Sequence, residues 1–469
     1  MLDVLRWLLL SIALLSLAEP VPAESARPLA DGPDAPQIER WLGSLGAADP
    51  LVCEMAVDSL GNSWGWSSRR VAVGVLHDRV GPGFEARRQL GRHSADPQAV
   101  PLLAGRLADP NPCVRRAAAI LLGSHLDPGA AKVARERLHD ASPVVREAAT
   151  MAVGEREDHE AYDELVRALG DDTVGVVRMS AWALGELEDP RAVTPLVGLL
   201  DSADTGARAA TVWALGEIED ARAVAPLAKR LRDADAGVRE LAASALGEIE
   251  SREATAALLA VLDDSDLGVR RAAVRALGEI EDPQSAVPLA KLLADDDEEL
   301  RVSTAHALGE IEDPRPVPEL ARALGDRSAE VRAAAASALG EIEDARAAPA
   351  LAKALSDPVR EVRERAVAAF GELDGLSEAP PALIAALADR DPEIRARAAS
   401  ALGEIGDPAA APALGRASKD EVVEVRRKAV EALAQLHGGN VADFLVAALR
   451  DGDPQVRKRA AEALGDRDE

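Results

Sequence analysis

The sequence predicts an all-α fold, an α-solenoid in which about fourteen antiparallel helix pairs form one superhelical stack. Three observations predict it. A glycine recurs at intervals of 31 residues, apolar residues follow helical spacing on either side of it, and aromatic residues make up only 2% of a chain that is 48% hydrophobic. Small apolar side chains suit thin layers of packed helices, whereas aromatic residues dominate the burial in deep globular cores.

The first residues predict a secretory signal peptide. An apolar run extends from Trp7 to Ala18, and the small residues Val21 and Ala23 occupy positions −3 and −1 of a cleavage site. The run is too short to span a bilayer, which needs about 20 apolar residues, and no other run approaches that length. We therefore expect residues 1–23 to be a signal peptide, residues 24–35 a linker, and no transmembrane segment after cleavage. An uncleaved N-terminal anchor is the alternative.

Residues 36–90 predict irregular N-terminal capping repeats. Turn-forming residues interrupt the pattern at residues 62–66 and 81–83, and the terminal units of a solenoid are usually atypical because they shield the stack from water. The two cysteines, Cys53 and Cys113, lie two units apart in this register, or about 20 Å at the usual spacing of helix layers. A disulfide needs Cα atoms within about 7 Å, so two separate thiols are expected unless the first units fold back.

Residues 91–466 predict the regular solenoid. Nine of the recurring glycines, which we call landmark glycines, follow one another without a change of interval, at positions 123, 154, 185, 216, 247, 278, 309, 340 and 371. In the unit that ends at Gly247, Asp220 can cap a first helix, an Asp-rich turn follows at residues 233–235, and a second helix continues to the landmark. One helix pair cannot bury its own apolar stripe, so the units must stack.

A second periodicity places an Arg eight residues before most landmark glycines and an Asp six residues before that Arg. The clearest pairs are Asp233/Arg239, Asp264/Arg270, Asp295/Arg301 and Asp326/Arg332. With these pairs the chain resembles HEAT repeats of the short subtype named after phycobilin lyase subunits, over roughly residues 36–466. The resemblance implies that the Asp and Arg side chains hydrogen-bond along the stack as a structural ladder, and that the second helices line a concave face.

Two enzyme families that use this repeat give the alternative function. A deoxyhypusine-hydroxylase-like oxidoreductase would need His-Glu pairs that start seven residues before the landmark glycines, and no His occupies those positions. The only His-Glu dipeptide, at His159, lies instead at the start of a first helix. A phycobilin-lyase-like enzyme or enzyme subunit would bind a chromophore in the cytoplasm, which the signal peptide argues against. We expect no catalytic residues, no metal and no cofactor, since HExxH, P-loop and paired-cysteine motifs are also absent from the sequence.

The best candidate site lies three residues before the landmark glycines, at what we call the −3 positions. On a helical wheel these positions lie beside the apolar stripe and are expected to be exposed. Two neighbouring −3 positions hold tryptophan, in the units where Val177 replaces the ladder Arg and Ser202 replaces the ladder Asp. The two indoles are either a protein-contact patch or packing between helices. The predicted partner-binding residues are Ile120, Met151, Arg178, Trp182, Trp213, Arg275 and His306.

The charge balance indicates which classes of partner the protein can bind. A net charge of −27 disfavours nucleic acid as a partner. A Glu follows most landmark glycines, which predicts either a solvated edge or a site for a basic partner or weak calcium. The sequence therefore predicts a monomeric, non-catalytic scaffold that binds another protein or peptide and is secreted or periplasmic. Only 7 of the 54 basic residues are Lys, which favours a GC-rich bacterial source.

Overall fold

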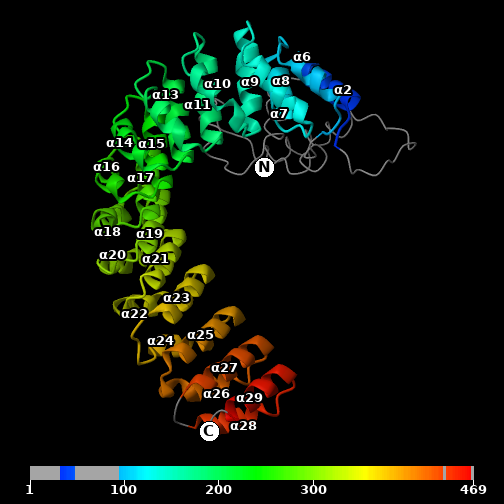
Figure 1. Ribbon diagram of the computed structural model, residues 1–469. Coiled ribbons are helices and arrows are strands. Elements are labelled where there is room, and N and C mark those ends of the chain that lie inside the picture. The colour runs from blue at the N-terminus through cyan, green and yellow to red at the C-terminus, as the bar shows by residue number, and fades with distance from the viewer. Residues whose placement is uncertain (1–31, 48–93, 437–439, 466–469) are drawn as a thin grey trace, which may run out of the picture. The chain divides into compact units, whose positions relative to one another are not determined.

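The computed structural model describes residues 32–47, 94–436 and 440–465 (Figure 1). The regular elements in these ranges are all helices, most of them joined in pairs by tight turns. The described residues fall into two compact units, unit 1 up to Leu187 and unit 2 from Glu188 onward. The predicted signal peptide and most of the predicted linker and cap lie outside the described residues.

In its described residues, unit 1 has one leading helix and three helix pairs. Helix α2, within the predicted cap, packs against the first pair. Its helices are α2 (Ala35–Ala47), α6 (Ala99–Arg106), α7 (Pro112–Gly123), α8 (Pro128–Arg137), α9 (Pro143–Glu155), α10 (Tyr162–Ala168) and α11 (Val174–Glu186).

Unit 2 continues the alternation of a short first helix and a longer second helix. Each second helix packs against the second helix of the next pair, which gives the predicted stack of layers. The first helices are α12 (Val193–Val197), α14 (Val224–Arg230), α16 (Thr255–Leu259), α18 (Pro283–Ala290), α20 (Val317–Ala323), α22 (Ala348–Ala354), α24 (Pro381–Ala386), α26 (Ala411–Ala417) and α28 (Val441–Ala448). The second helices are α13 (Thr205–Glu217), α15 (Ala236–Glu248), α17 (Leu267–Glu279), α19 (Glu298–Glu310), α21 (Ala329–Glu341), α23 (Arg360–Glu372), α25 (Pro392–Ile405), α27 (Val423–Gln435) and α29 (Pro454–Gly465).

Side-chain caps begin the helices where the sequence places Asp. The Asp220 carboxylate accepts a hydrogen bond from the backbone N–H of Arg222 at 2.9 Å and starts the 3₁₀ turn that leads into α14. The Asp235 carboxylate accepts one from Val238 N–H at 3.1 Å and starts α15. Each cap satisfies a backbone donor that the helix itself leaves unpaired.

The helices end in an unexpected way. Seven glutamates that close second helices have positive φ, between 49° and 59°, where glycine is favoured: Glu157, Glu188, Glu219, Glu250, Glu281, Glu312 and Glu343. Left-handed backbone costs a non-glycine residue about 1–2 kcal/mol. In the later units Gly375 and Gly406 take the positive φ. The repeat therefore keeps an acidic residue at a position where glycine would be less strained.

The landmark glycines allow the layers to approach closely. A methyl group at Gly247 would lie 2.9 Å from both Cα and Cβ of Ala276 on the next second helix, and would collide with the Glu279 carboxylate. Gly278 and Gly340 have the same surroundings, each against the second helix of the layer that follows it. A larger residue would push two layers apart, which explains why the glycine marks each unit.

The expectation of two separate thiols is wrong. Cys113, at the start of α7, is disulfide-bonded, and the described residues contain no free cysteine. The chain's other cysteine, Cys53, lies outside the described residues. The expectation of separate thiols rested on a regular spacing of layers upstream of α6, and a bonded Cys113 does not fit that assumption.

Candidate interaction surface

The Asp and Arg residues of the predicted ladder join one helix pair to the next. Arg332 is typical. Its Nη1 donates a hydrogen bond to the backbone O of Asp326 at 2.9 Å, and its Nε and Nη2 donate to the Asp357 carboxylate of the following pair at 2.7 and 3.0 Å. Arg301 makes the same link to Asp326. The ion pairs run along the stack, and the contact within a unit is to the backbone.

One rung of the ladder is shifted. Arg270 donates to the backbone O of Asp264 at 2.8 Å, but no bond to Asp295 forms. The neighbouring Arg271 instead donates to the Asp297 carboxylate, with Nη2 2.9 Å from both oxygens. The ladder residues are thus largely buried and committed to the fold, which leaves them little capacity to bind a partner.

The −3 positions divide into a buried and an exposed set. The exposure expected of Ile120, Met151, Trp182 and Trp213 is not found, since all four side chains are buried. Trp182 packs on the preceding layer, where a methyl group at Gly154 would come within 2.6 Å of its Cζ3. The indole Nε1 atoms of both tryptophans are buried without a hydrogen-bond partner. Of the two alternatives, these side chains therefore pack between helices. The expectation of exposure was wrong because a helical wheel does not show how closely the adjacent layers approach.

The remaining −3 positions are accessible. Arg275 on α17 and His306 on α19 are exposed, and these two helices pack against each other. Arg178, the other predicted contact residue, is half-buried on α11. Further along unit 2, the −3 positions are half-buried or exposed and small or charged: Ser337, Ala368, Ser400, Glu431 and Glu462.

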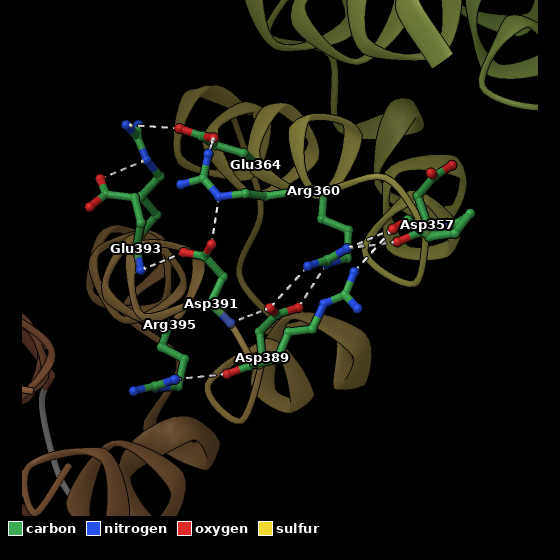
Figure 2. A network of polar contacts seen from close by, with 11 residues as sticks. Asp357, Arg360, Glu364, Asp389, Asp391, Glu393 and Arg395 are labelled. Carbon is green, nitrogen blue, oxygen red and sulfur yellow. Dashed lines mark hydrogen bonds and ion pairs between the residues drawn. The ribbon is translucent and has the colours of Figure 1, made fainter. Parts of the chain in front are cut away.

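A shallow cleft of about 380 Å³ lies on this side of α23 and α25. It is lined by Arg360, Glu361, Glu364, Arg365, Ala368 and Arg397. Figure 2 shows Arg360 between Glu364, 2.8 Å away, and Asp391 of the next pair, 2.5 Å away. Arg397 reaches back to Glu364 at 3.4 Å.

These ion pairs hold the rim of the cleft across two layers, while Arg365 and Arg397 remain exposed to solvent. The arrangement offers guanidinium donors and carboxylate acceptors to a polar segment. It contains no nucleophile held beside a base. The sequence signal for this cleft is an Arg six residues before the landmark glycine in two successive units, Arg365 and Arg397, and it matches none of the motifs considered above.

A column of carboxylates crosses the landmark glycines. Glu248 lies over Gly216, Glu279 over Gly247 and Glu310 over Gly278. The Glu248 side chain reaches solvent, but the helices around it displace part of its water. This loss of water, together with the negative charges of Glu217 and Glu279, raises the pKa of Glu248 to about 7. Loss of water also raises the pKa of four other members, Glu279, Glu341, Glu372 and Glu404.

Within the described residues, no group of three or more His, Cys, Asp or Glu side chains is arranged to hold a metal ion. His159, of the single His-Glu dipeptide, is exposed in the 3₁₀ turn before α10. No described helix has the length and apolar character needed to cross a membrane.

The repeat units match a known family model along most of the chain. The model for HEAT repeats matches seven overlapping segments, residues 84–151, 99–184, 178–243, 224–303, 286–371, 354–434 and 380–465. The chain belongs to the HEAT-repeat family. Together with the stacked pairs of unit 2, this match establishes an all-α solenoid. The short subtype of the HEAT repeat stays a prediction. No curated protein matches the chain.

Solved structures resemble this HEAT-repeat protein at low identity. An engineered protein of a structural genomics consortium is 21% identical over 79% of this chain and 99% of its own, with a TM-score of 0.38. A chain in a structure of Kap95p binding to RanGDP is 17% identical over 91% of this chain and 64% of its own, with a TM-score of 0.47. YIBA_ECOLI is 21% identical over 52% of this chain and 91% of its own, with a TM-score of 0.43. At these identities the likeness concerns the fold alone.

Proposed function

We propose that this HEAT-repeat protein is a non-catalytic scaffold that binds a protein or peptide along the −3 positions of the second helices in unit 2. The observation that carries the proposal is the contrast between neighbouring positions of one repeat. The residues around the landmark glycine are nearly constant and pack the layers, whereas the −3 positions are accessible and change from Arg275 to His306 to Ser337 in successive units. Side chains that do not pack the layers, and whose identity differs from layer to layer, can recognise a series of different side chains on a partner.

The dimensions of the surface suit an extended segment. Helix layers are spaced by about 9–10 Å, which is close to the rise of three residues of extended chain at about 3.3 Å each. A partner segment could place every third side chain against one layer. The carboxylate column beside the −3 positions of the middle units would favour a basic segment there. A monomer stays the expected state of the free protein.

Site-specific photo-cross-linking tests the proposal. A cross-linking amino acid at position 275 or 306 should label one partner in an envelope or secreted fraction of the source organism. The matched control places it at Arg322, which is exposed on the first helix α20, and should give no product. Charge reversal in the carboxylate column by Glu310→Lys should then weaken the purified complex with a basic segment by about tenfold, or 1.4 kcal/mol. Equal labelling from positions 275 and 322 would contradict the proposed surface.

Export is the second part of the proposal. It is supported by the signal-like residues 1–23 and by the bonded state of Cys113, since disulfides persist mainly in oxidising compartments. The mature protein should begin at Glu24, which mass spectrometry of the protein from its native source measures directly. An intact Met1 would indicate the uncleaved anchor instead.

A further inference from the structure

The contacts between successive second helices of unit 2, which we call joints, each enclose a carboxylate. The Glu that follows a landmark glycine lies against the landmark glycine of the preceding second helix, where an added Cβ atom would collide with its carboxylate. The arrangement recurs at the five joints between α13 and α23 (Figure 1), with Glu248, Glu279, Glu310, Glu341 and Glu372. Each member of the carboxylate column therefore lies where two helices come close together.

These carboxylates have little compensation for the water that they lose. The ladder aspartates are paired, since Asp264 receives two hydrogen bonds from Arg239. By contrast, no hydrogen bond or ion pair from the described residues reaches Glu248, Glu279, Glu341 or Glu372. A charge that is partly removed from water and left unpaired is unfavourable. The ionised form of the column therefore strains the joints that enclose it.

A second glutamate adds negative charge to the same joints. It is the glutamate with positive φ that closes the preceding second helix. After the loss of water, its charge is a further cause that raises the pKa of the column member, in the pairs Glu219/Glu248, Glu250/Glu279, Glu312/Glu341 and Glu343/Glu372. Where Gly375 takes the positive φ, no like charge from the described residues acts on Glu404. The strained position thus brings to a joint a charge that glycine would not.

At the first of the five joints every charge that acts on the column is negative. Helices α13, α14 and α17 pack against α15. The charged groups that act on Glu248 come from the end of α13 and from α17, and they are Glu217, Glu219 and Glu279. The last joint is similar, since the groups that act on Glu372 are Glu341, Glu343 and Glu404. The joints between these two also contain opposing basic groups, which are Arg275, His306 and Arg365.

We propose that the joints from α13 to α23 act as a pH-sensitive spacer, which closes when the carboxylate column is protonated and widens when it ionises. A closed joint holds the proton more tightly than a wider joint in which water reaches the carboxylate, so removing protons shifts the population toward the wider form. The change falls between about pH 6 and about pH 8, the range in which Glu248 titrates. The −3 positions lie four residues before the column on the same helices, so wider joints also increase the spacing of the proposed binding surface.

Pulsed electron paramagnetic resonance on the full chain tests the spacer without any partner. Spin labels on Thr194→Cys in α12 and Lys353→Cys in α22, two exposed positions, span the five joints, or about 45–50 Å at the usual spacing of helix layers. The mean distance between the labels should be longer at about pH 8 than at about pH 6. Glu248→Gln/Glu372→Gln removes the two carboxylates that only like charges face, and it should reduce the change by about half.

Matched variants separate the column from charge in general. Glu253→Gln/Glu330→Gln removes two exposed carboxylates outside the column and should leave the change in distance as it is. An imidazole titrates in the same pH range, so His306→Gln is the second control and should retain most of the change. Equal distances at the two pH values would overturn the proposal, as would a full change in Glu248→Gln/Glu372→Gln or its loss in either control. Because no partner is present, the spacer and the proposed binding surface can fail separately.

Discussion

The guanidinium of Arg239 donates from Nε and Nη2 to both carboxylate oxygens of Asp264, at 2.9 and 2.8 Å, while its Nη1 donates to the backbone O of Asp233 at 3.0 Å. One side chain therefore connects the turn of its own helix pair with the turn of the next. Both partners are about 14% exposed, so the link is largely shielded from water and salt. It orients each layer on the one before it.

Removing the carboxylate from this link should destabilise the stack. Asp264→Ala leaves the Arg239 guanidinium unpaired in a largely buried turn, and we expect the free energy of unfolding to fall by about 2–3 kcal/mol. Chemical denaturation followed by circular dichroism measures it. The matched control is Arg222→Ala, which removes a pair with Asp220 whose Arg is 56% exposed. That change should cost less than about 1 kcal/mol, and an equal loss in both variants would contradict the ladder's role.

The landmark glycine should tolerate no side chain inside the stack. Gly247→Ala places a methyl group 2.9 Å from Ala276 on the next layer, and we expect a loss of about 1–3 kcal/mol from overpacking. Gly465→Ala is the control, because nothing lies within 4 Å of that position. There the better helix propensity of alanine should leave stability unchanged or raise it by up to about 1 kcal/mol. Thermal unfolding of both variants provides the comparison.

Stability should fall as the pH rises through the titration of Glu248. Its pKa in the folded chain, raised to about 7 chiefly by loss of water, exceeds its ordinary value of 4.5. The folded state therefore holds the proton more tightly than the unfolded state, and its advantage, complete below about 4.5, is lost as the pH passes 7. The charged groups that act on it are Glu217, Glu279 and Glu219.

Glu248→Gln should therefore raise the urea midpoint at pH 8 and leave it nearly unchanged at pH 4.5. For a ladder aspartate such as Asp264 the change of stability with pH has the opposite sign, because hydrogen bonds from Arg239 hold the pKa of Asp264 below 3.8. Their contribution is present above about 3.8 and is lost only in stronger acid. A larger effect of Glu248→Gln at pH 4.5 than at pH 8 would show that the carboxylate titrates normally.

Reduction should weaken unit 1. The bonded Cys113 predicts that the denatured, unreduced protein contains no free thiol, which a colorimetric thiol assay measures. Cys113→Ser should lower the free energy of unfolding by about 2–4 kcal/mol. Cys53→Ser should have the same effect, and the double variant should be no worse than either single variant. Two reactive thiols in the native protein would contradict the bond.

Trp213 should matter for stability. Its side chain is only 3% exposed, so Trp213→Ser removes a large buried ring and should cost about 3–5 kcal/mol. Trp213→Phe should cost much less, since it keeps most of the apolar area and the buried Nε1 has no hydrogen bond to lose. Thermal unfolding measures both. A melting temperature for Trp213→Ser close to that of the unchanged protein would show that the ring is exposed in solution.

Periodicity was the part of the sequence that predicted structure well. The interval of 31 residues, the Asp220 cap and the pairing of Arg with Asp all depend on residues that are local or repeat at a fixed distance. The structure has the cap, and it has the pairing at Arg239, although at Arg270 the neighbouring Arg271 makes the link. Predictions for the site were less accurate. Ile120, Met151 and the two tryptophans were assigned to a surface from a helical wheel, which describes one helix and not its neighbours.

The sequence by itself determined the helix pairs, their order and the glycine that spaces them, because a helix pair with a repeated apolar stripe is buried only by stacking on its neighbours. Tertiary structure alone decided which −3 side chains reach solvent and that Cys113 is bonded. Each of these depends on how closely one layer approaches the next, or on a segment outside the regular register. Whether a −3 side chain is buried depends on how closely the neighbouring layer packs against it, and the sequence of a single unit does not specify that distance.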